Sequence, residues 1–167
     1  GTISCSSKQG GGSTFTVVLP FKILEEQFSE SDDSTDGQPV TLDGSNILLV
    51  EDNDMNREIA NVILSEMGAN VIEAADGSDA IEMMKGADAD RFDLILMDVQ
   101  MPVVDGYEAT RRIRALGTRA SQIPIIAMTA NAFEEDRKTA IAAGMDGHIA
   151  KPIDIDALTA TLKRFLH

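Results

Sequence analysis

The sequence predicts an α/β fold built on a mostly parallel β-sheet that helices cover on both faces. Three observations support this fold class. Short aliphatic runs recur from about residue 45 onward, and segments with helical periodicity separate them. The 167 residues are 43% hydrophobic with no Trp and only 4% aromatic residues, so the core must be aliphatic. A core of this size suits one compact domain with appendages.

The amino-terminal part has a different composition. Phe15, Val17 and Leu19 alternate after a run of glycines, which is the pattern of a β-hairpin. The following stretch is acidic, rich in Ser and Asp and poor in aliphatic residues, which is typical of a solvated linker. We therefore expect a hairpin at residues 1–24, a linker at 25–44 and a folded domain at 45–167.

Five strands and the helices between them are expected in the folded domain. The strand candidates are residues 47–50, 71–73, 94–97, 125–128 and 148–150. The first helix carries on one face Ile59, Val62, Ile63 and Met67 and ends at Gly68. The last helix carries, at steps of three and four, Ile155, Leu158, Leu162 and Phe165.

Polar side chains follow four of these strands. Glu51 and Asp52 follow the first, Asp98 the third, Thr129 the fourth and Lys151 the fifth. Because the carboxyl ends of parallel strands meet at one edge of a sheet, these side chains are expected at one ligand site. Two carboxylates repel each other by about 4 kcal/mol at roughly 4 Å and an effective dielectric constant of about 20. A cation is therefore needed among the three acids.

Oxygen-only ligands suit Mg²⁺, which binds one or two carboxylates together with water and a phosphate oxygen. Lys151 adds a further positive charge, and Thr129 offers a hydroxyl group to a phosphoryl oxygen. This set of residues predicts that Asp98 accepts a phosphoryl group while the metal ion and the lysine neutralise its charge.

Residues 45–167 resemble the receiver domain of two-component response regulators. The matching motifs, in chain order, are LLVEDN, LMDVQMPVVDG, AMTAN and AKP. The resemblance implies a five-stranded, flavodoxin-like (βα)5 fold, phosphorylation of Asp98, catalytic roles for Thr129 and Lys151, and often a cis bond between Lys151 and Pro152.

The same resemblance implies the ligands of the metal ion. Mg²⁺ would be held by Asp52, Asp98 and the backbone carbonyl of Gln100, and Glu51 would act through a metal-bound water.

Three further residues are expected to tune the site. Gln100 and Asn131 lie two residues after Asp98 and Thr129, and we expect them to control water access and so the lifetime of the phosphoryl group. His148 stands three residues before the lysine, where the family often has a Phe or Tyr that moves inward on phosphorylation. This departure puts the usual aromatic switch in question.

The first 21 residues resemble the closing hairpin of the histidine kinase ATP-binding domain, in which a glycine turn and Ser-Thr-Phe precede the last strand. The resemblance implies a parent that is a hybrid sensor histidine kinase, and a first residue other than Met fits a fragment. The ATP motifs would lie upstream, so this fragment is expected to accept a phosphoryl group and slowly hydrolyse it, without binding ATP. We expect residues 14–20 to pack against the receiver or pair with another chain.

The expected partners belong to the same phosphorelay: a phosphohistidine in the parent kinase or a dimer mate as donor, and a histidine phosphotransfer protein as acceptor. The formal net charge of −14 argues against nucleic acid and anionic membranes as partners. The single cysteine excludes an internal disulfide, and neither a long apolar run nor a signal peptide is visible. A cytoplasmic location is expected, with a membrane anchor in the parent kinase left open.

Two other functions stay open from the sequence. A binding-only pseudo-receiver would keep the fold without being phosphorylated. A hydrolase of the same fold is disfavoured, since haloacid-dehalogenase phosphatases need a second Asp where Gln100 stands. For Glu51 and Asp52 the plain alternative is helix capping, although Asn53 or Asp54 would already fill that position.

Overall fold

The protein is described here by a computed structural model that covers residues 1–8, 10–19, 41–86, 88–130 and 134–166. The chain divides into two units, Gly1–Gly37 and Gln38–His167. The predicted tuning residue Asn131 lies outside the described residues, as does most of the predicted linker.

The first unit contains the predicted hairpin, formed by β1 (Thr2–Lys8) and β2 (Gly12–Val18). Ile3 pairs with Val17 and Cys5 with Phe15, so the apolar side chains share one face. This face is open within the unit, since Ile3 is 73% and Phe15 69% exposed. Two strands alone are marginally stable in water, so the hairpin needs a partner surface. The packing predicted for residues 14–20 stays a prediction.

The second unit contains a five-stranded parallel sheet with the strand order β4-β3-β5-β6-β7. Its strands are β3 (Asn46–Val50), β4 (Asn70–Ala74), β5 (Leu94–Asp98), β6 (Ile125–Thr129) and β7 (Gly147–Ala150). Each of them contains the strand predicted from the sequence. This is the flavodoxin-like order, in which the second strand lies at one edge beside the first, and the predicted fold class is confirmed.

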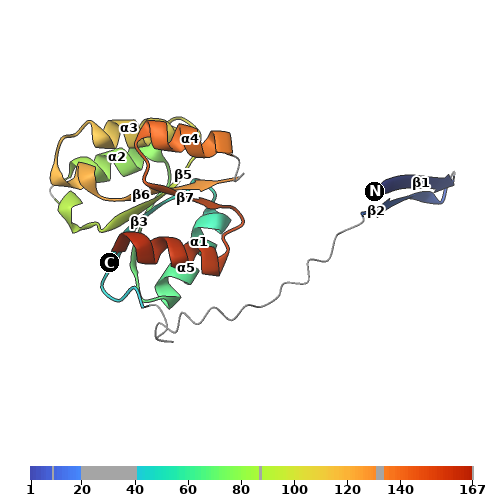
Figure 1. The fold of residues 1–167 in the computed structure, drawn as a ribbon, viewed down its shortest axis with the longest axis horizontal. Helices are drawn as coiled ribbons and strands as arrows, with labels where there is room; N and C mark the ends of the chain where they lie inside the picture. The colour runs from blue at the N-terminus through green and yellow to red at the C-terminus, as the bar shows by residue number, and fades with distance from the viewer. Residues whose placement is uncertain (9, 20–40, 87, 131–133, 167) are drawn as a thin grey trace. The chain divides into compact units, whose positions relative to one another are not determined.

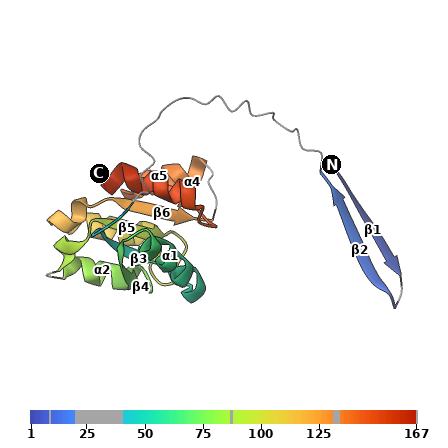
Figure 2. The same ribbon diagram turned by 90° about the horizontal axis from the view of Figure 1, so that it is seen from below.

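Five α-helices in the described residues cover the sheet: α1 (Asp54–Glu66), α2 (Gly77–Lys85), α3 (Gly106–Arg114), α4 (Glu134–Ala143) and α5 (Ile155–Leu166). Helices α2, α3 and α4 lie on one face, and α1 and α5 lie on the other (Figure 1). The turned view shows β4 at one edge, followed by β3, β5 and β6 (Figure 2).

Successive residues of each strand face opposite layers of the core. On β3, Leu48 and Val50 pack with residues of α2 and α3, whereas Ile47 and Leu49 pack with Leu64 of α1 and with α5. The strands therefore read as continuous aliphatic runs because both of their faces are buried. With both faces filled by aliphatic side chains, only the strand ends are left to carry chemistry.

The core also includes Leu42, a residue of the predicted linker. Leu42 is 2% exposed and packs in the α1/α5 layer of the core. Its backbone N–H donates to the carbonyl of Met67 at 2.6 Å, and its own carbonyl accepts from the Ser45 N–H at 2.9 Å. Packing in the second unit thus begins before Ser45, where composition places the start of the domain. The domain limits 1–24, 25–44 and 45–167 otherwise stay a prediction.

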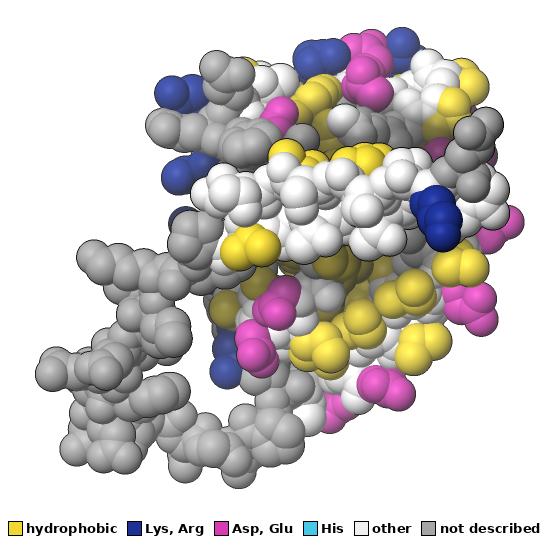
Figure 3. Space-filling model, turned by 90° about the vertical axis from the view of Figure 1, so that its right-hand side faces the viewer, with side chains coloured by type: hydrophobic (Ala, Val, Ile, Leu, Met, Phe, Trp, Pro, Cys, Tyr) yellow, Lys and Arg dark blue, Asp and Glu magenta, His cyan; other side chains and the backbone are white. Residues whose placement is uncertain are grey.

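Exposed hydrophobic side chains gather on α1. Met55 is 71% exposed, and Ile59 and Val62 are each 51% exposed. We call these three residues the α1 apolar patch. Figure 3 shows hydrophobic side chains gathered in the lower part of the view, on the side of the sheet that α1 and α5 cover. A contiguous apolar surface of this kind typically marks a contact with another molecule.

Candidate functional site

The acidic pair Glu51 and Asp52 lies in the turn between β3 and α1. The cap of α1 is Asn53, whose side chain accepts a hydrogen bond from the Asn56 N–H at 3.1 Å. Since Asn53 fills the cap position, the capping alternative for the acidic pair is not needed. Glu51 is 2% exposed, whereas Asp52 is exposed. A buried carboxylate that caps no helix requires specific partners.

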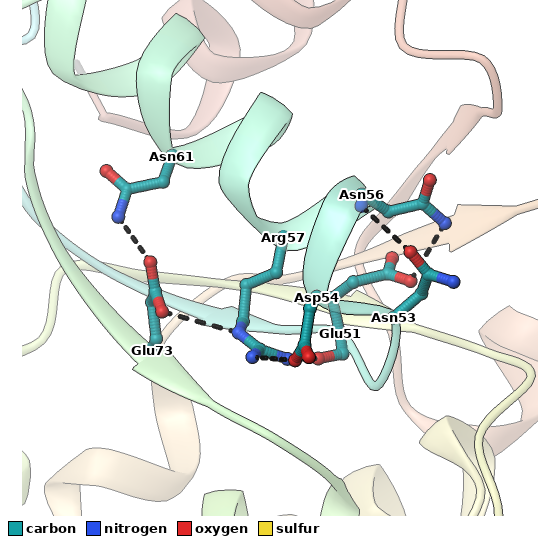
Figure 4. A network of polar contacts seen from close by, with 7 residues as sticks. All are labelled: Glu51, Asn53, Asp54, Asn56, Arg57, Asn61 and Glu73. Carbon is teal, nitrogen blue, oxygen red and sulfur yellow. Dashed lines mark hydrogen bonds and ion pairs between the residues drawn. The ribbon is translucent and has the colours of Figure 1, made fainter.

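Glu51 has partners on both of its carboxylate oxygens. Lys151 Nζ donates to Glu51 Oε2 at 2.5 Å, and Asn56 Nδ2 donates to Glu51 Oε1 at 3.2 Å. The backbone carbonyl of Glu51 accepts from Arg57 Nη1 at 2.7 Å. Arg57 also contacts Asp54 and Glu73, so the start of α1 is tied to both β3 and β4 (Figure 4).

Asp98 is the last residue of β5 and is 4% exposed. The Gln100 N–H donates to Asp98 Oδ1 at 3.1 Å, and Lys151 Nζ lies 2.8 Å from Asp98 Oδ2. The Asp-Gly pair that follows has a structural reason. Asp105 caps α3 by accepting from the Glu108 N–H, and a Cβ at Gly106 would lie 2.2 Å from the Asp98 carbonyl oxygen. Only glycine permits this close approach.

Lys151 follows β7 directly and bridges the two buried acids. Its backbone N–H donates to the carbonyl of Thr129 at 2.7 Å, which fixes the residue beside the end of β6. The Lys151–Pro152 peptide bond is cis, as the resemblance implies. The ammonium group thus lies where it offsets the charge of both Glu51 and Asp98.

Burial raises the pKa of Asp98 above its ordinary value, and Glu51 adds to this effect, whereas the hydrogen bond and charge of Lys151 lower it only in part. For Lys151, burial works to lower the pKa, but contacts with Asp98 and Glu51 outweigh burial and raise it. The lysine therefore stays charged at neutral pH, while ionised Asp98 is destabilised by its surroundings.

Glu51, Asp52 and Asp98 can offer three oxygen ligands, and these atoms lie within 4.8 Å of one another. Two oxygens bound to one Mg²⁺ at about 2.1 Å are separated by at most about 4.2 Å, so small side-chain movements would suffice. Carboxylate oxygens suit a hard divalent ion, and the ion would offset the burial and the repulsion by Glu51 that together raise the pKa of Asp98. The donor set therefore fits Mg²⁺.

In Mg²⁺-free buffer at pH 7, Asp98→Asn is expected to raise the free energy of unfolding, because the amide carries no charge that burial can destabilise. The Asp98 carboxyl has a higher pKa in the folded protein than in the unfolded chain, so the folded protein binds this proton more tightly. The wild type therefore loses stability as pH rises above about 3.8, the ordinary pKa of the group. The gain from the substitution should therefore shrink as pH falls toward 3.8.

Urea denaturation between pH 5 and pH 8 would measure this gain. Asp88→Asn, a change at an exposed residue whose side chain makes no capping hydrogen bond, is the control and should leave stability unchanged within about 0.5 kcal/mol. A loss of stability in Asp98→Asn at pH 7 would contradict this account of the buried charge.

Three further predicted residues lie at or near the ends of strands β5, β6 and β7. Thr129 is the last residue of β6 and is 4% exposed. Gln100 lies in the loop after β5, beside Asp98. His148 lies on β7 opposite Ala127, is half-buried, and lines a cavity of about 580 Å³ together with Ile141 and Phe165. The sheet thus brings Glu51, Asp52, Asp98, Thr129 and Lys151 to one edge, and His148 faces a separate cavity.

Two residues of this site, Asn56 and Arg57, are not among those predicted from the sequence. Both contact Glu51, one through its side chain and the other through its backbone carbonyl. A signal was present: Asn56 and Arg57 lie three and four residues after the cap Asn53, which places them on the same side of the first helical turn.

Comparison with known proteins shows the family to which the chain is similar. The sequence profile of the response regulator receiver domain family matches residues 47–163. The aerobic respiration control sensor protein ArcB of Escherichia coli (strain K12) is 36% identical over 165 residues, which are 99% of this chain and 20% of that protein. This chain therefore spans about a fifth of the length of the curated relatives that match it first.

Two solved receiver domains are similar to this chain in sequence and in fold. One is the receiver domain of a sensor histidine kinase from Pseudomonas aeruginosa PAO1, which was solved with a magnesium ion coordinated in its active site cleft. It is 42% identical to this chain and superposes with a TM-score of 0.66, covering 74% of this chain and 98% of that domain. The other is a receiver domain from Saccharomyces cerevisiae, which was co-crystallised with the histidine phosphotransfer signaling protein upstream of it. It is 30% identical to this chain and superposes with a TM-score of 0.65, covering 74% of this chain and 89% of that domain.

Within the part of the chain that the structure describes, no helix is both long enough and apolar enough to cross a membrane.

Proposed function

This chain belongs to the response regulator receiver domain family of two-component phosphorelays, and from that premise we propose that Asp98 accepts a phosphoryl group from a phosphohistidine. The observation that carries the proposal is the position of buried Asp98. Its carboxylate lies 2.8 Å from Lys151 Nζ, and one of its oxygens lies within 4.8 Å of oxygens of Glu51 and Asp52, so that one metal ion could bind among the three acids. A buried acid that only shaped a turn would have no need of this arrangement.

In the proposed transfer the N–P bond of the phosphohistidine breaks, and an O–P bond to a carboxylate oxygen of Asp98 forms. Lys151 neutralises a phosphoryl oxygen, and the Thr129 hydroxyl donates a hydrogen bond to another. Mg²⁺, held by Asp52, Asp98 and the backbone carbonyl of Gln100, supplies the remaining positive charge when it is bound. Glu51 acts at the outer side of the metal site, through water.

Water later attacks the phosphorus of the acyl phosphate, which returns Asp98 as a free carboxylate and releases inorganic phosphate. We assign Gln100 and Asn131 to the control of water access to this bond. His148 takes the place of the aromatic switch residue, and its half-buried position beside the cavity on α4, β7 and α5 supports a role in reporting phosphorylation to that face.

We infer that the parent protein is a hybrid sensor histidine kinase. The relatives include proteins of that type, such as hybrid signal transduction histidine kinase L of Dictyostelium discoideum. The similarity to ArcB extends over 165 residues and so includes the hairpin unit. The open apolar face of the hairpin supports its assignment as the last part of the kinase ATP-binding domain, which would cover that face.

The proposed partners are a phosphohistidine of the parent kinase or of a dimer mate, as donor, and a histidine phosphotransfer protein, as onward acceptor. The receiver domain from Saccharomyces cerevisiae that is similar to this chain was crystallised with such a protein. The α1 apolar patch supports this partner, because Ile59 also lines a pocket of about 350 Å³ beside Glu51 and Lys151. A protein docked there would bring its histidine close to Asp98.

The test of this proposal is transfer between proteins. A histidine phosphotransfer domain, radiolabelled on its histidine, should pass the label to this chain only when Mg²⁺ is present. Ile59→Asp should slow this transfer about tenfold or more, since a central apolar contact contributes about 2 kcal/mol or more to binding. The same variant should react normally with acetyl phosphate, which needs no docking surface.

Ile141→Asp is the matched control, because Ile141 is 57% exposed on α4, in the opposite helical layer. It should transfer at the wild-type rate. If Ile59→Asp and Ile141→Asp slow the transfer equally, the partner docks elsewhere. If no label moves to the wild-type chain from this donor or from acetyl phosphate, the proposed function itself is contradicted.

A further inference from the structure

Glu51 differs from the other buried acid of the site, Asp98, in receiving a hydrogen bond from a side-chain amide. Its side chain is buried, and separate donors engage its two oxygens: Lys151 Nζ at Oε2 and Asn56 Nδ2 at Oε1. Asp98 shares the same lysine, but Asn56 contacts Glu51 alone among the three acids in the interactions described. The asparagine therefore fixes the direction of one particular carboxylate.

The helix that carries Asn56 is itself anchored. Arg57, the next residue, donates to the backbone carbonyl of Glu51 at 2.7 Å and to Glu73 Oε2 on β4 at 3.3 Å. Asn61, one turn further along α1, also donates to Glu73 (Figure 4). Because these contacts tie the first turns of α1 to the sheet, the Asn56 amide is presented to Glu51 from a fixed backbone.

We propose that Asn56 is a positioning residue for the metal site, which orients Glu51 and thereby sets the affinity of this chain for Mg²⁺. Each carboxylate oxygen has two lone-pair directions, so an amide that occupies one direction on Oε1 leaves the other available to accept a hydrogen bond from a water bound to the ion. Without the amide, the Glu51 side chain can rotate toward Lys151 alone. Hydrogen-bonding partners in the outer shell of a metal site typically contribute about 10- to 100-fold to metal affinity.

This inference rests on the proposed function, since it assumes that the acidic cluster binds Mg²⁺. The test is isothermal titration calorimetry of Mg²⁺ into the wild type and Asn56→Leu, which keeps the side-chain volume and removes the donor. The dissociation constant for Mg²⁺ is expected to rise about tenfold. Asn56→Gln, which restores an amide donor on an exposed position, should recover most of the affinity.

Asn61→Leu is the matched control, because it removes the same amide from the same helix but breaks a contact with Glu73 and not with Glu51. It should bind Mg²⁺ as the wild type does. A second readout is labelling by acetyl phosphate at increasing Mg²⁺: Asn56→Leu should need about tenfold more Mg²⁺ for half the maximal rate and reach the wild-type rate at saturation. A purely structural defect would lower the saturating rate as well.

The outcomes separate the two claims. If the wild type binds no Mg²⁺, the metal-dependent function proposed above is contradicted. If the wild type binds Mg²⁺ and Asn56→Leu binds it equally well or more tightly, the positioning role of Asn56 is overturned alone. An equal weakening in Asn61→Leu would also overturn it, because the effect would then belong to the anchoring of α1.

Discussion

Lys151→Met is expected to slow phosphorylation of Asp98 by acetyl phosphate about 10²- to 10³-fold, the usual effect of removing one group that stabilises charge in a transition state. The loss follows from the position of Nζ, which lies within 2.8 Å of both buried acids and is the cation that joins them. Methionine keeps the length and apolar stem of the side chain but cannot neutralise the phosphoryl oxygens.

The rate would be followed by intact mass at saturating Mg²⁺, so that a change in metal affinity does not mask the effect. Lys163→Met, on the exposed surface of α5, is the matched control and should react at the wild-type rate. Circular dichroism would show that each variant is folded. A folded Lys151→Met protein that reacts at nearly the wild-type rate would remove Lys151 from the proposed chemistry.

Leu42→Ala should lower the free energy of unfolding of the receiver unit by about 2 to 5 kcal/mol. Leu42 is 2% exposed and fills space in the core layer beneath α1 and α5, so its truncation leaves a cavity. Because a typical domain is stable by only about 5 to 15 kcal/mol, this is a large fraction of the total. Urea denaturation followed by circular dichroism would measure it.

Leu19→Ala provides the comparison, since Leu19 is 59% exposed and the same atoms are removed. Its effect on stability should stay within about 0.5 kcal/mol. Equal stabilities for Leu42→Ala and the wild type would show that the segment before β3 does not belong to the folded core, and that the domain begins at Ser45 as its composition suggests.

The fold was predictable because its signal is distributed along the chain. Every strand of a doubly covered sheet must be aliphatic on both faces, and the runs at 47–50 and 94–97 satisfy this requirement without reference to their neighbours. The convergence of Asp52, Asp98 and Lys151 was predictable for the same reason, since parallel strands place their carboxyl ends together.

Contacts that depend on one side chain were harder to predict. Leu42 stands in a stretch with the composition of a linker, and nothing local shows that the fold leaves room for it. Asn56 is a polar residue on an exposed helical surface, where most amides face water. Its spacing from the cap Asn53 places it on the first helical turn, but its partner is identified by the buried Glu51 carboxylate of the folded protein.

Phosphorylation of Asp98 is tested most directly by intact-mass spectrometry of the wild type and Asp98→Asn after incubation with acetyl phosphate, with and without Mg²⁺. We expect the wild type to gain a single phosphoryl group in a reaction that depends on Mg²⁺ and is reversed by hydroxylamine, and we expect Asp98→Asn to gain none. A folded, Mg²⁺-binding wild type that gains no phosphoryl group at any time, or an adduct that persists in Asp98→Asn, would contradict this expectation.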